Sequence, residues 1–132
     1  MNVLAKPSVA WGYGAFFLCG ATCAHFDELG ATHFGLVSDW IAAIMLIIGG
    51  VVSGRDWLRG RQYQIVGWAF VVSLLLHSFL GNLEDLINHA PDAGGSNGLV
   101  ALPLVPYLVI VGMLCVIAIG GLWTTLSASD HK

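Results

Sequence analysis

The segment Ile41-Ala-Ala-Ile-Met-Leu-Ile-Ile48 decides the fold class of this chain. It forms the centre of an apolar stretch that runs from about residue 34 to about residue 54, with Gly49, Gly50 and Gly54 toward its end. At about 1.5 Å of rise per residue, a helix of this length crosses the hydrocarbon core of a bilayer, which is roughly 30 Å thick. The stretch therefore predicts a transmembrane helix.

Three other apolar stretches have the same character. They predict spanning helices at about residues 8–26, 63–83 and 99–125, and the helix at 63–83 is expected to extend to about residue 89. Pro103 and Pro106 fall near the start of the last helix, where proline is tolerated. These patterns predict an all-α fold: one integral membrane domain over residues 1–132, built as a four-helix bundle with short loops.

The composition of the whole chain is typical of a membrane protein. Of its 132 residues, 57% are apolar and 10% are charged, and the mean hydropathy is +0.80. Soluble domains carry about 25% charged residues. Cys19, Cys23 and Cys115 lie in apolar segments without a C-x-x-C pair, so we expect them to pack as small apolar side chains. We expect membrane lipids, and no nucleic acid, as partners.

Charge is distributed unevenly between the two sides of the predicted helices. The basic residues all lie on one side: Lys6, Arg55, Arg59, Arg61 and Lys132. The positive-inside rule assigns that side to the cytoplasm, so the N- and C-termini and the Arg55–Arg61 turn are predicted to be cytoplasmic. Six acidic residues lie on the periplasmic or exterior side: Asp27, Glu28, Asp39, Glu84, Asp85 and Asp92. We expect an integral protein of a bacterial inner membrane.

The predicted helix at 63–83 carries polar residues into the bilayer. One small and polar helix face is formed by residues that recur at every fourth position: Ala69, Ser73, His77, Gly81 and Asp85. We expect this face to pack inside the bundle, because a polar side chain at membrane depth needs a partner. His77 lies about 10 Å along the helix axis from Glu84, which places it in the outer half of the bilayer.

Histidines and carboxylates gather at the outer ends of the predicted helices. Asp85 and His89 are one helical turn apart, a spacing that can chelate zinc or copper. The predicted metal ligands are His25, His33, Glu84, Asp85 and His89, and the predicted cofactor-binding residues are His77 and His25, with haem b as the cofactor considered. The same residues equally fit solvated charges that enforce topology, and His77 equally fits a neutral interhelical hydrogen bond.

No segment carries a motif for a named reaction. The chain offers neither a hydrolase triad nor a glycine-rich phosphate loop, so we expect no catalytic activity from it alone. Short loops and small-residue helix faces favour an accessory or structural subunit of a larger membrane complex, for example of respiratory or oxidase type, or a homo-oligomer. Two alternatives stay open: a redox or metal-binding protein of electron transport, with haem b, copper or quinone near the outer face, and a small transporter.

Overall fold

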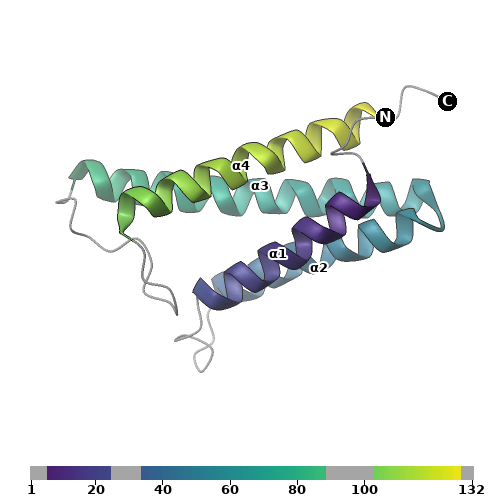
Figure 1. Cartoon of the computed structure of the whole chain (residues 1–132), viewed down its shortest axis with the longest axis horizontal. Helices are drawn as coiled ribbons and strands as arrows, with labels where there is room; N and C mark the ends of the chain where they lie inside the picture. The colour runs from purple at the N-terminus through teal and green to yellow at the C-terminus, as the bar shows by residue number, and fades with distance from the viewer. Residues whose placement is uncertain (1–5, 25–33, 89–102, 129–132) are drawn as a thin grey trace.

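The computed structural model describes residues 6–24, 34–88 and 103–128, and these residues are almost entirely helical. Four α-helices follow one another: α1 (Pro7–Ala24), α2 (Phe34–Ser53), α3 (Trp57–Asn88) and α4 (Leu104–Ser127) (Figure 1). The described residues form no strand. The prediction of an all-α fold is therefore confirmed.

The N-terminal end of α3 differs most from the prediction. The helix begins at Trp57 rather than at about residue 63. Asp56 accounts for this start, because its Oδ1 accepts a hydrogen bond of 3.2 Å from the backbone N–H of Arg59, as an N-cap residue does. The first turns of α3 are polar, so hydropathy alone does not reveal them. The predicted helix ends at 25–26, 89 and 99–102 lie outside the described residues.

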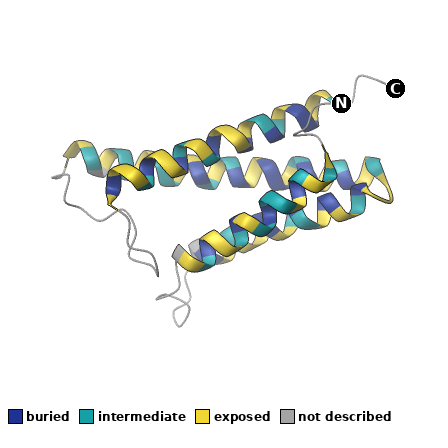
Figure 2. Ribbon diagram, in the orientation of Figure 1, coloured by how far each residue is buried: buried dark blue, intermediate teal, exposed yellow. Residues whose placement is uncertain are grey.

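Three of the four helices are long and apolar enough to cross a membrane. They are α2 over Leu36–Ser53, α3 and α4. α1 has 18 residues and no charged side chain, but Trp11, Tyr13 and its glycines lower its hydropathy, and it is not among these three. Large apolar residues are exposed along all four helices. Figure 2 shows exposed segments, in yellow, along the length of each helix.

Consecutive helices pack against each other in antiparallel order, α1 on α2, α2 on α3 and α3 on α4. Figure 1 shows the α1–α2 pair diverging from the α3–α4 pair toward the C-terminal end of α1. A hydrogen bond of 2.9 Å from the Tyr13 hydroxyl to the Leu114 carbonyl joins α1 to α4. Among the described residues, α1 does not pack along the length of α4, so the predicted four-helix bundle is not confirmed.

Glycines allow the helices to approach closely at several points. A Cβ added to Gly49 of α2 would lie 2.7 Å from the backbone nitrogen of Gln64 in α3. One added to Gly121 of α4 would lie 2.7 Å from the ring of Trp68. A Cβ added to Gly50 of α2 would lie 2.7 Å from the Pro7 carbonyl oxygen and 2.8 Å from Trp11, both in α1. These glycines therefore serve contacts within the chain.

Candidate functional site

A buried polar cluster joins α2 to α3 near the turn between them. Gln64 is fully buried, and its Nε2 donates hydrogen bonds to Ser53 Oγ at 2.9 Å and to the Gly49 carbonyl at 3.4 Å. Ser53 Oγ in turn donates to the Gly49 carbonyl at 2.7 Å. Where no water reaches the helices, such bonds supply the partners that polar groups require. The cluster therefore fixes the register of α3 against α2.

Trp68 lies one turn further along the same face of α3 and is also fully buried. Its ring packs against the ring of Tyr13 in α1, with centroids 4.9 Å apart and planes inclined by 54°, and against Gly121 in α4. Trp68 Nε1 and Gln64 Oε1 are buried without a hydrogen-bond partner among the described residues. The indole therefore holds α1, α3 and α4 together mainly by packing.

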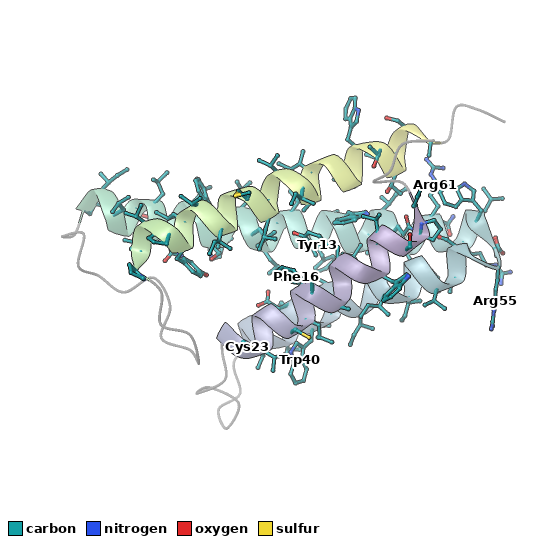
Figure 3. The ribbon with its side chains drawn as sticks, in the orientation of Figure 1. Tyr13, Phe16, Cys23, Trp40, Arg55 and Arg61 are labelled. Atoms are coloured by element: carbon teal, nitrogen blue, oxygen red, sulfur yellow. The ribbon has the colours of Figure 1, made fainter. Side chains whose placement is uncertain are left out.

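Arg61 connects α3 to the C-terminal end of α4. Its Nε donates to the Thr125 carbonyl at 2.9 Å and its Nη2 to the Leu126 carbonyl at 3.0 Å (Figure 3). The last carbonyls of a helix lack partners within the helix, and a cation there interacts favourably with the helix dipole. Arg59 instead pairs with Asp56, with Nε and Oδ2 3.4 Å apart. Arg55 is exposed at the turn.

The outward face of α3 is the side turned away from α2 and α4. It consists of exposed residues at helical spacing: Gln62, Val66, Ala69, Ser73, His77, Leu80 and Glu84. The expectation that the stripe through Ala69, Ser73 and His77 packs inside the bundle is therefore wrong. α3 buries the opposite face instead, through Gln64, Trp68, Val71 and Leu75.

The side chains of Ser73 and His77 make no hydrogen bond with any residue in the described part of the chain. Other helix hydroxyls behave differently. Thr22 donates to the Leu18 carbonyl at 2.7 Å, and Thr125 donates to the Gly121 carbonyl at 2.7 Å. Ser78 shares a hydrogen bond of 3.2 Å with the Tyr107 hydroxyl of α4. The outward face of α3 thus presents polar groups that the described helices leave unpaired.

The predicted metal and cofactor site falls largely outside the described residues. His25, His33 and His89 lie there, and Asp85 belongs to α3 but its side chain is not described. Glu84 and His77 are exposed on α3. The described residues contain no group of three or more His, Cys, Asp or Glu side chains that could hold a metal ion. The metal and haem sites stay predictions.

The interhelical roles of Gln64, Trp68 and Arg61 were not predicted from the sequence, which indicated only a cytoplasmic position for Arg61. Gln64, Trp68 and Arg61 carry the contacts described above, and the available signal was the four-residue spacing of Gly60, Gln64 and Trp68 on one face of α3. The cysteine prediction was correct only in part, because Cys115 is buried whereas Cys19 and Cys23 are exposed.

Comparisons of the chain with known protein families, curated proteins and solved structures identified no relative. No protein-family model, no curated protein and no solved structure matches the chain. Evidence about its function therefore comes from its own helices and side chains.

Proposed function

We propose that this protein is an accessory, structural subunit of a larger membrane complex, with four spanning helices and both termini in the cytoplasm. α1 is the fourth span in this proposal, because it packs along α2 and carries no charged side chain. Arg55 and Arg59 at the α2–α3 turn support the orientation, since basic residues favour the cytoplasmic side. The acidic loops then face the periplasm or exterior.

The observation that carries the proposal is the exposure of Ser73 and His77 on a helix apolar enough to span a membrane. An unpaired polar group in hydrocarbon costs several kcal/mol. An imidazole at that depth therefore favours a neighbouring helix that supplies a hydrogen-bond partner. Among the described helices, α3 uses its other face for α2 and α4, and we propose that the partner comes from another subunit.

The internal polar groups support a structural role. Gln64 and Ser53 bond to each other across α2 and α3, and Arg61 bonds to the end of α4. These groups hold helices together, which is what a scaffold or spacer in a complex requires. Polar groups at interhelical contacts commonly have this role in membrane proteins.

Blue-native electrophoresis of gently solubilised native membranes tests the proposal. The chain has a mass of 14.0 kDa, so a complex should place it in a band well above a monomer or dimer. A second, denaturing dimension with mass spectrometry should recover the same co-migrating membrane proteins in repeated preparations. Migration as a monomer alone, in several mild detergents, would refute the proposal.

A further inference from the structure

We propose that the outward face of α3 is a two-fold interface for a second copy of this chain. The proposal rests on the proposed placement of α3 across the membrane and names one partner for that helix. Its basis is the unpaired Ser73 and His77 at the middle of the face, together with the chemistry of these two side chains.

The outward face has the geometry of a helix-packing seam. The residues of this face, and Ile87 beyond them, which is also exposed, follow one another at steps of three or four residues, close to the 3.5-residue repeat of left-handed helix pairs. Ala69 and Ser73 are small, which lets two backbones approach closely. A Cβ added to Gly81, at the edge of the face, would meet no atom within 4 Å. The seam is therefore open along α3.

The polar chemistry of the face is complementary to itself. In a two-fold interface between parallel copies, each residue meets residues of the other copy at the same membrane depth. A serine hydroxyl and a neutral imidazole each donate and accept a hydrogen bond. Ser73 and His77 of one copy can therefore satisfy those of the other, whereas a lysine or a carboxylate could not pair with its own copy.

The outward face of α4 provides a contrast. Over residues 105–117 its exposed large side chains are all apolar: Val105, Val109, Ile110, Met113, Val116 and Ile117. Such a surface is fully satisfied by lipid and needs no protein partner. At the ends of the α3 face, Arg59 is paired with Asp56, and Glu84 lies about 10 Å beyond His77. Repulsion between equal charges of the two copies is weak there, because water and salt screen it.

Disulfide formation between copies tests the interface. In a background with Cys19→Ala, Cys23→Ala and Cys115→Ala, single cysteines are introduced as Leu80→Cys and Ser73→Cys, and membranes are oxidised with copper phenanthroline. The matched control is Val109→Cys, because Val109 is 56% exposed and Leu80 is 54% exposed. We expect dimers on non-reducing gels for both α3 variants and not for the control. Equal dimer formation at position 109, or none on α3, would overturn the proposal.

A dissociation measurement tests the role of His77. Interhelical hydrogen bonds in membranes contribute about 0.6 kcal/mol on average and up to about 1.7 kcal/mol, so His77→Leu should weaken the dimer about 3- to 20-fold. Energy transfer between fluorescently labelled copies in liposomes measures the dissociation constant of the dimer. His77→Gln retains a donor and an acceptor and should recover part of the loss, and Val109→Leu should have no effect. Undiminished association of His77→Leu would contradict the proposal.

The two proposals fail in different ways. A native band that contains other subunits, without disulfide-linked copies, would refute the interface and leave the accessory role intact. Disulfide-linked copies whose native band holds this chain alone would support the interface and refute the accessory role. A disulfide from position 73 to a different protein would assign the outward face of α3 to that protein and refute the second copy.

Discussion

Replacement of Gly49 by alanine should separate α2 from α3. The added Cβ would lie 2.7 Å from the Gln64 backbone nitrogen, and ordinary contact begins at 3.4 Å, so the helices must move apart by about 0.7 Å. A shift of that size along the bond would stretch the 2.9 Å bond from Gln64 Nε2 to Ser53 Oγ beyond hydrogen-bond range.

Three contributions determine how much Gly49→Ala changes the free energy of unfolding. Overpacking in a well-packed interior costs about 1–3 kcal/mol, and the lost interhelical bond costs about 0.6 kcal/mol. The better helix propensity of alanine offsets up to about 1 kcal/mol of this loss of stability. We therefore expect the free energy of unfolding to fall by about 1–3 kcal/mol.

Reversible unfolding by SDS in mixed micelles, followed by tryptophan fluorescence, measures this change. Gly20→Ala is the matched control, because a Cβ at Gly20 meets no atom within 4 Å. It should leave stability unchanged or raise it by up to about 1 kcal/mol. If Gly49→Ala were as stable as Gly20→Ala, the close approach of α2 and α3 would be wrong.

Other substitutions probe the remaining contacts. Arg61→Ala should lower the free energy of unfolding by about 1 kcal/mol in the same SDS titration, because it removes the hydrogen-bond donors of two α4 carbonyls. The control is Arg55→Ala at an exposed position, which should change the free energy of unfolding by less than about 0.5 kcal/mol. Tyr13→Phe should cost about 0.5–1.5 kcal/mol through the lost bond to α4, and half-exposed Tyr63→Phe should be nearly neutral; equal effects would contradict that bond. The visible spectrum of the purified protein should show no Soret band that depends on His77, and a band abolished by His77→Ala would make this residue a haem ligand instead of an interface residue.

The positions of α2 and of the central part of α3 could be predicted because apolar length alone defines a spanning helix. The start of α3 could not, because it depends on the local hydrogen bond from Arg59 N–H to Asp56. α1 is not among the helices apolar enough to cross a membrane, because its glycines, Trp11 and Tyr13 lower its hydropathy over the described residues, so its role as a span stays a prediction.

The prediction of which face of α3 packs against the other helices was wrong. α3 carries polar residues on two opposite faces, Gln64 on one and His77 on the other, and a periodic pattern does not tell which face meets a neighbouring helix of the same chain. The contacts that decide it join distant parts of the chain, such as Trp68 with Gly121 and Arg61 with Thr125. These contacts depend on the register between helices, which local sequence does not encode.

Photo-crosslinking in living cells tests most directly the central claim that protein covers the outward face of α3. Benzoylphenylalanine is incorporated at Leu80, with the similarly exposed Val109 on α4 as the reference position. The account predicts a defined protein adduct from position 80, identified by mass spectrometry as a second copy or a co-migrating subunit, and no protein adduct from position 109. Equal behaviour at both positions, with no protein adduct from position 80, would contradict it.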